Sequence, residues 1–324
     1  MLKTNFFIST LITIFFIFFS TLYYFKKNDK YTEEAFVHKA SHYFKSENYF
    51  QAVRYYKKLI SMGSADEKNY INIAISLIKT GNYNSAIKHL SFMEQNNMVS
   101  GDIYYLLAYS YYSKIKKFDK VNDFIVPIRY LEKSLETDSK NKNVYKLLGT
   151  IYEKLNEFEQ ARKRYEKALS EDLGNSYEFY GLIANTYFKE NRYDEALKFY
   201  KKAVETNRNY ISSYTNIAEI YAMQNNFTEA ENYYKKAIEI SPEYVFPYYK
   251  IGCLYFIKQE YETAIKWYNK ALEIEPNETI VNYFAGITYK KLNMLNESVE
   301  HLKLAAYCGN DDAVEELRKM SVIF

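Results

Sequence analysis

The hydrophobic and polar positions of the chain follow a pattern that returns every 34 residues from Glu33 onwards. Each copy has two halves with apolar residues at helical spacing, separated by short polar segments such as residues 189–192. In the first half, the residue at one fixed position is alanine or glycine in all eight copies: Ala40, Ala74, Ala108, Gly149, Ala184, Ala218, Gly252 and Gly286. The pattern therefore predicts two antiparallel helices in each copy, packed closely at these small residues.

Aromatic residues recur at fixed distances from the small residues. In the first half, seven copies have a tyrosine three positions after the small residue: Tyr43, Tyr111, Tyr152, Tyr187, Tyr221, Tyr255 and Tyr289. The remaining copy has Leu77 at this position. The second half has an alanine in six copies, replaced by Pro127 and Ser298 in two. Four positions further on, five copies have a second aromatic: Tyr56, Tyr165, Tyr200, Tyr234 and Tyr268. We expect both sets of tyrosines in the core, which neighbouring copies must share because one helix pair cannot bury its apolar face alone.

The pattern resembles the tetratricopeptide repeat, most closely from Tyr221 to Pro242 (YAMQNNFTEAENYYKKAIEISP). The resemblance implies an all-α fold: an α-solenoid, a right-handed superhelix of about eight helix-turn-helix repeats over residues 33–312. The third copy carries an insertion near residues 114–126, which predicts a longer loop or longer helices there. Residues 313–324 are expected to complete a C-terminal capping helix and tail, because the stretch DDAVEELRKM begins acidic, ends basic and has apolar residues at helical spacing.

The N-terminal segment is of a different kind. After a tail of residues 1–5, residues 6–25 carry no charge, and a helix of this length spans roughly 30 Å, the thickness of the hydrocarbon layer of a bilayer. A basic linker of residues 26–32 follows. We interpret the segment as a single-pass transmembrane helix or signal anchor; a cleaved signal peptide and a buried helix are the alternatives. The lysines after the span favour a cytoplasmic C-terminal domain over a periplasmic or secreted one.

Charge and motifs argue against two classes of function. The 43 basic and 40 acidic residues leave a net charge of +3, without long runs of one sign, so no nucleic-acid partner is expected. The sequence lacks the phosphate-loop, metalloprotease and serine-hydrolase motifs, and its two cysteines, Cys253 and Cys308, cannot form a disulfide framework. We therefore predict no enzymatic activity, no cofactor and no metal site.

The family resemblance also implies where a partner would bind, because the first helices of such repeats line a concave groove. The groove-facing positions of the family fall here on Tyr105, Tyr109, Tyr112, Phe188, Phe246, Tyr249, Phe256 and Tyr283. An aromatic groove suits a partner segment with apolar anchors. Some relatives instead hold a C-terminal carboxylate in a clamp of lysine, asparagine and arginine. Matching clamp positions hold Asn185, Asn216 and Lys250 here, but Gly181 and Phe246 replace two of the clamp lysines.

The sequence thus predicts a membrane-tethered scaffold that binds a partner protein or peptide in its groove and performs no chemistry. Two alternatives remain open at this point. One is an exported or periplasmic repeat protein that acts in cell-envelope assembly, and the other is an accessory subunit of an enzyme complex.

Overall fold

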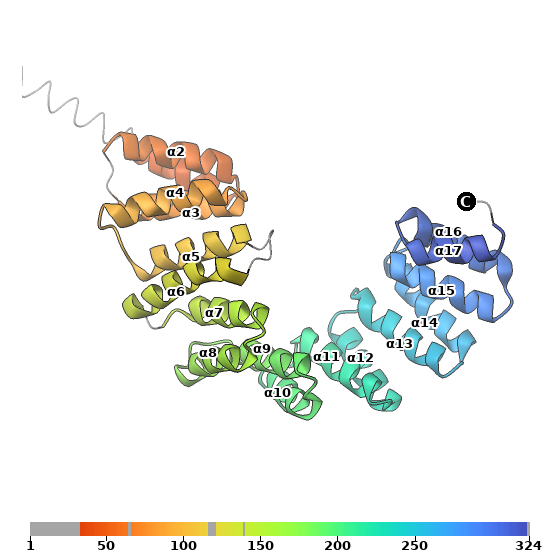
Figure 1. Ribbon diagram of the computed structural model, residues 1–324. Helices are drawn as coiled ribbons and strands as arrows, with labels where there is room; N and C mark the ends of the chain where they lie inside the picture. The colour runs from red at the N-terminus through yellow and green to blue at the C-terminus, as the bar shows by residue number, and fades with distance from the viewer. Residues whose placement is uncertain (1–32, 64–65, 116–120, 139, 323–324) are drawn as a thin grey trace, which may run out of the picture. The chain divides into compact units, whose positions relative to one another are not determined.

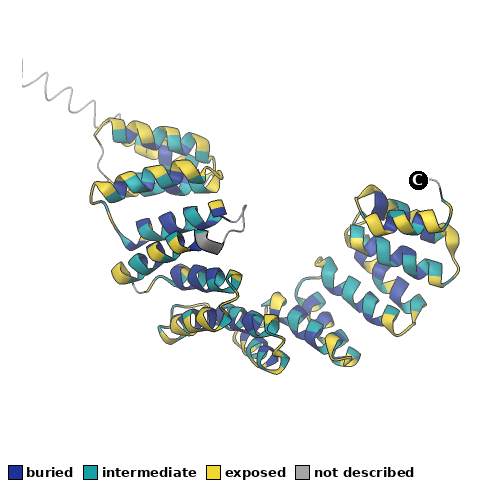
Figure 2. Ribbon diagram, in the orientation of Figure 1, coloured by how far each residue is buried: buried dark blue, intermediate teal, exposed yellow. Residues whose placement is uncertain are grey.

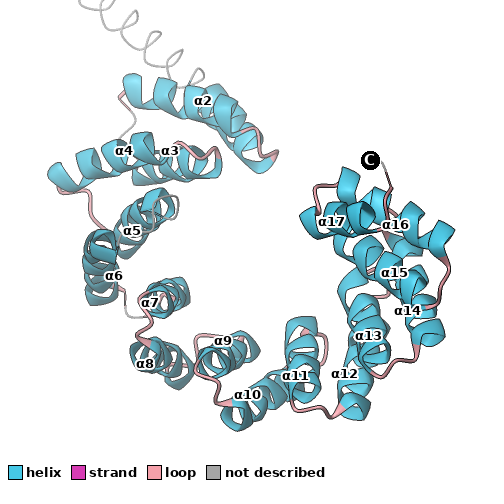
Figure 3. Ribbon diagram, turned by 45° about the vertical axis from the view of Figure 1, so that its right-hand side comes forward, coloured by secondary structure: helices cyan, strands magenta, loops and turns pink. Residues whose placement is uncertain are grey.

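The computed structural model describes residues 33–63, 66–115, 121–138 and 140–322, and in these residues the only regular elements are helices (Figure 3). The first-half helices, here called A helices, are residues 33–45, α3 (Glu67–Lys79), α5 (Gly101–Ile115), α7 (Lys142–Lys154), α9 (Ser176–Lys189), α11 (Ile211–Met223), α13 (Val245–Ile257) and α15 (Thr279–Lys291). The second-half helices, here called B helices, are α2 (Tyr49–Ser61), α4 (Tyr83–Gln95), α6 (Ile125–Thr137), α8 (Phe158–Ser170), α10 (Tyr193–Thr206), α12 (Phe227–Ile240), α14 (Tyr261–Ile274) and α16 (Leu295–Tyr307).

The chain divides into two compact units (Figure 1). Unit 1 ends at residue 155, just after α7, and unit 2 begins at residue 156, just before α8. Inside each unit every helix packs on the next one along the chain, and A helices of consecutive copies also touch, as α3 touches α5 and α13 touches α15. These contacts between neighbours confirm the predicted all-α solenoid.

Buried residues occur along the helices of both units (Figure 2), and the B-helix tyrosines are among them. Tyr56, Tyr165, Tyr200, Tyr234 and Tyr268 all have at most 2% of their surface exposed. In several copies the small residue of an A helix belongs to the same buried cluster as the B-helix ring, as Ala184 does with Tyr200 and Ala218 with Tyr234. The contact is close in the seventh copy, where a Cβ added at Gly252 would lie 2.6 Å from Cδ1 of Tyr268. The small residues therefore set the distance between the two helices.

The A-helix tyrosines have a different environment from the one expected. They are only partly buried. In most copies the ring stacks on an aromatic ring of a B helix, as Tyr187 does on Phe199 (centroids 5.5 Å apart) and Tyr221 on Tyr233 (5.7 Å). The expectation of a core position is wrong for Tyr255. The side chain is partly buried, and its hydroxyl donates to a carboxylate oxygen of Glu231 at 3.0 Å.

The turns from A to B helices share one backbone conformation. A residue with φ between +58° and +73° occupies the same place in seven copies: Glu47, Gly81, Asn156, Asn191, Asn225, Gln259 and Asn293. The next N–H donates to a carbonyl five residues earlier, from Arg192 to Tyr187 (2.9 Å) and from Asn226 to Tyr221 (2.8 Å). Asparagine enters the left-handed region more readily than most residues with a side chain. This is how a chain with only 9 glycines forms so many tight turns.

The predicted insertion lies between α5 and α6. Helix α5 has 15 residues, two more than α3, and a short 3₁₀ helix, η1 (Val121–Phe124), leads into α6. Pro127 is in the first turn of α6, where its missing N–H breaks no helical hydrogen bond. Residues 116–120 lie outside the described part of the chain.

The predicted capping helix is confirmed as α17 (Asp311–Lys319), which packs on α16. Oδ1 of Asn310 accepts the N–H of Ala313 at 2.7 Å, and Ala313 and Leu317 are buried in a cluster that includes Leu302. Two aspartates in the first turn and two basic residues in the last match the helix dipole. The helix thus covers apolar residues that another repeat would otherwise cover.

Among the helices of the described residues, none combines the length and the apolar character that crossing a membrane requires. The segment predicted to do so, residues 6–25, lies outside the described residues.

The contact between Gly252 and Tyr268 makes a test of the packing. Gly252→Ala is expected to lower the free energy of unfolding by about 1–3 kcal/mol, because the added methyl group overlaps the ring. In a Tyr268→Ala background the ring is absent, so the same change should be neutral or stabilising, since alanine favours a helix over glycine. Urea unfolding of the four proteins in this cycle, followed by circular dichroism, measures both effects. An equal cost of Gly252→Ala in both backgrounds would contradict the proposed contact.

Candidate functional site

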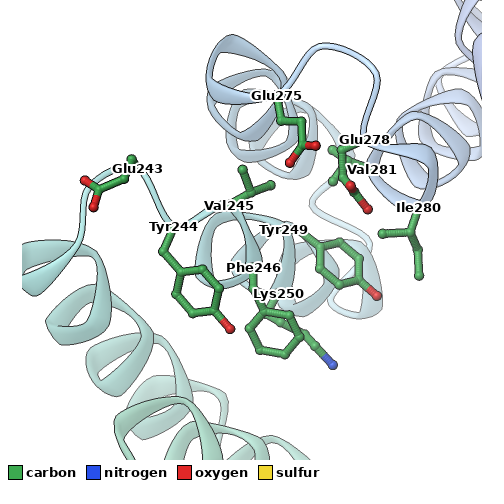
Figure 4. A pocket seen from close by; sticks show the side chains of 10 residues that line it. All are labelled: Glu243, Tyr244, Val245, Phe246, Tyr249, Lys250, Glu275, Glu278, Ile280 and Val281. Carbon is green, nitrogen blue, oxygen red and sulfur yellow. The ribbon is translucent and has the colours of Figure 1, made fainter. Parts of the chain in front are cut away.

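A hollow of about 570 Å³ opens at the start of α13 in unit 2 (Figure 4). Its aromatic lining comes from Tyr244, Phe246 and Tyr249. Two neighbouring loops contribute Glu243 on one side and Glu275 and Glu278 on the other, and α15 contributes Ile280 and Val281. We call this the α13 hollow. It is larger than any of the other hollows described below.

The three rings of the α13 hollow contact one another in sequence. Tyr244 stacks on Phe246, with centroids 5.9 Å apart, and Phe246 meets Tyr249 edge to face at 6.2 Å. Tyr249 in turn packs on Phe284 of α15 at 5.7 Å. Tyr244 is 40% exposed, so one end of this row of rings is open to a ligand. Such mutual packing holds the rings in place before anything binds.

Lys250 lies at the inner edge of the α13 hollow. Its ammonium group is 2.8 Å from Oε1 of Glu219 on α11, and it lies 4.9 Å from the ring centroid of Phe246. The same lysine lines a second hollow of about 350 Å³, together with Phe188 of α9, Met223 of α11 and Cys253. Lys250 lines both hollows, and we call the two together the unit 2 groove. The groove is thus formed by A helices of consecutive copies, with the loops before α13 and α15 at one end.

Three ionisable groups in the groove have shifted pKa values. Burial raises the pKa of the Cys253 thiol and of the Tyr249 phenol, so both groups stay protonated at neutral pH. The Ser241 hydroxyl donates to Oε1 of Glu243 at 2.8 Å and lowers the pKa of that carboxyl, which is therefore ionised. A nucleophile or general base needs the opposite shifts.

The residues at the carboxylate-clamp positions contact other residues of the chain. Oδ1 of Asn185 accepts the hydroxyl of Tyr200 at 2.5 Å and the amide of Asn216 at 3.3 Å. Gly181 is covered by the ring of Tyr210, since a Cβ there would lie 3.0 Å from the Tyr210 hydroxyl oxygen. With Lys250 paired to Glu219, the polar groups at these positions already have partners within the chain.

Two other residues of unit 2 that the sequence placed in the groove, Phe256 and Tyr283, line neither of its hollows. Phe256 meets Tyr261 edge to face at 5.5 Å and also contacts Phe284, so its ring is part of the packing between α13, α14 and α15. Tyr283 packs on the cluster formed by α16 and α17. Neither residue lines the α13 hollow.

Unit 1 has a separate hollow of about 430 Å³ between α3 and α5. Tyr105 and Tyr109 line it, with ring centroids 6.2 Å apart, and burial raises the pKa of Tyr105 to about 12. Tyr112 is only 8% exposed and packs on Phe124. The sequence-predicted aromatics of α5 are therefore divided between a surface hollow and the core.

The sequence analysis did not identify Tyr244 or the three carboxylates of the α13 hollow. All four residues lie in or beside turns that lead from a B helix to an A helix, outside the positions that the family pattern marks. A signal is present in the sequence, because Ser241-Pro242-Glu243 and Glu275-Pro276 repeat a proline beside a glutamate at two successive turns. Among the described residues, no group of three or more His, Cys, Asp or Glu side chains is arranged to hold a metal ion.

Comparison with known families gives three matches, all to models of the tetratricopeptide repeat. They cover residues 144–177, 176–243 and 246–278, and so include most of the unit 2 groove. No curated protein has a sequence that matches this chain.

Solved structures show the same fold. The C-terminal part of a TPR repeat-containing protein from Cytophaga hutchinsonii has a TM-score of 0.58 and 18% identity, covering 75% of this chain and 96% of that one. The structure of pilF from Pseudomonas aeruginosa has a TM-score of 0.53 and 16% identity, covering 70% of this chain and 96% of that one. The Cut9–Hcn1 hetero-tetramer of the APC/C has a TM-score of 0.53 and 14% identity, and the match covers 87% of this chain and 55% of that one. Residues 144–278 thus match the tetratricopeptide repeat in sequence, and the solenoid of paired helices has the fold of such repeats.

Proposed function

We propose that this chain is a membrane-tethered scaffold that holds a segment of a partner protein in the unit 2 groove and performs no chemistry. The observation that carries the proposal is the row of rings in the α13 hollow. Tyr244, Phe246 and Tyr249 are in mutual contact, and Lys250 lines both their hollow and the second one. Aromatic residues in preformed hollows are the residues that contribute most to binding in protein interfaces.

The form of the groove favours an extended or helical segment over a small molecule. Its residues come from α9, α11, α13 and α15, so a ligand that fills it must reach across several copies. The raised pKa values of Cys253 and Tyr249 support a binding role without catalysis, because neither group is activated as a nucleophile.

The tether is proposed from the sequence alone. Residues 6–25 are uncharged and long enough to span a bilayer, and lysines follow directly. On this proposal the basic linker of residues 26–32 connects the membrane to the first A helix, and the positive flank favours a cytoplasmic position for the repeats.

The binding role is tested by removing rings from the open end of the row. Tyr244→Ala combined with Phe246→Ala should weaken partner binding by about 2 kcal/mol or more, because both changes remove contact area from the hollow. The full chain, tagged and purified in mild detergent from its own cells, should recover a partner that the double variant loses. Phe50→Ala is the matched control, since Phe50 is 77% exposed in α2 of unit 1. Equal recovery by the double variant, with an unchanged melting temperature, would contradict binding in the unit 2 groove.

The tether is tested by extraction. The full chain should stay in the membrane pellet after washing with high salt and with alkali, whereas a chain that begins at Glu33 should be found in the supernatant. Immunoblotting of both fractions measures this. Release of the intact chain by alkali would refute the anchor, and loss of the first residues from the mature protein would favour the alternative of a cleaved signal peptide.

A further inference from the structure

We infer that the α13 hollow accepts a basic side chain, lysine or arginine, from the partner segment. This inference rests on the proposed function, because it specifies the chemistry of the segment held in the unit 2 groove. It follows from three features of the hollow: its charge, its rings and its apolar wall.

The charge of the hollow is negative. Glu243, Glu275 and Glu278 line it, and its one basic residue, Lys250, is already paired with Glu219. In the described part of the chain, none of the three lining carboxylates forms an ion pair. Figure 4 shows that the three carboxylates come from the loops on either side of α13, so they flank the rings. A positively charged group among them would compensate a charge that the chain itself leaves uncompensated.

The rings suit a cation in particular. The ammonium group of Lys250 lies 4.9 Å from the centroid of Phe246 and 5.7 Å from that of Tyr249, so the chain already places one cation against this row. Tyr244, at the open end of the row, presents a further ring with 40% of its surface exposed. A guanidinium or ammonium group gains from contact with aromatic faces as well as from carboxylates.

The wall of the hollow matches the rest of such a side chain. Val245 and Ile280 line it, and Ile280 is 41% exposed. Lysine and arginine have aliphatic stems that pack on apolar surface while the charged end reaches polar groups. A metal ion lacks such a stem, and the described residues contain no cluster with the geometry to hold one. A carboxylate or phosphate would meet three like charges.

The experiment begins with a selection. Random peptides displayed on phage are selected on the immobilised full chain in detergent, and enriched sequences are synthesised with a fluorescent label. We expect enrichment of peptides with arginine or lysine beside an apolar residue. Replacing that arginine by citrulline, or that lysine by acetyl-lysine, should weaken binding about tenfold in fluorescence anisotropy. Glu275→Gln combined with Glu278→Gln should weaken the unmodified peptide similarly and reduce the dependence of its affinity on salt.

Glu239→Gln is the matched control, since Glu239 is exposed on α12 and does not line the hollow. It should leave the affinity unchanged. Enriched peptides without a basic residue, or peptides whose affinity does not change in the Glu275/Glu278 variant, would overturn the inference and leave the proposed function standing. A selection in which no peptide depends on Tyr244 and Phe246 would overturn the proposed function, and the inference with it.

Discussion

The contact between a small residue of an A helix and a B-helix side chain determines much of this structure. Ala218 beside Tyr234 and Gly252 beside Tyr268 allow two helix backbones to approach until a complete ring fills the space between them. Because this contact fixes how an A helix is rotated against its B helix, it also determines which A-helix residues face away from the pair. Phe246, Tyr249 and Lys250 line the hollow as a result, and none of the three is part of that contact.

The helices were predictable from the 34-residue period of the sequence, but the extent to which each side chain is buried was not. Tyr255 and Tyr268 both occupy positions that recur as tyrosine in most copies, yet Tyr268 is fully buried, whereas Tyr255 is partly buried and bonds to Glu231. Each residue along a helix is rotated by about 100° from the one before it. Tyr255, three residues after Gly252, therefore points about 60° away from the direction in which Gly252 faces its B helix. The pattern identifies an apolar side of a helix but does not show where its buried centre lies.

The binding site was predictable to a similar extent. The pattern placed Phe246, Tyr249 and Lys250 on one face, and the structure brings them into one hollow. Phe256 is seven residues after Tyr249 and shares its face, but Tyr261 at the start of α14 packs on its ring. The carboxylates come from turns between copies, and their position beside α13 depends on how two consecutive copies pack. Helical periodicity carries no information about that packing.

The single tryptophan of the chain, Trp267, lies in α14 of unit 2. Its ring packs on Tyr248 at 6.1 Å, and the amine of Lys270 lies 4.3 Å from its centroid. The hydroxyl of Tyr248 donates to the carbonyl of Pro242, in the loop that carries Glu243. Indole fluorescence is therefore an intrinsic optical signal from unit 2 alone. Far-ultraviolet dichroism reports on both units, so the difference between the two signals separates the unfolding of unit 1 from that of unit 2 without any label.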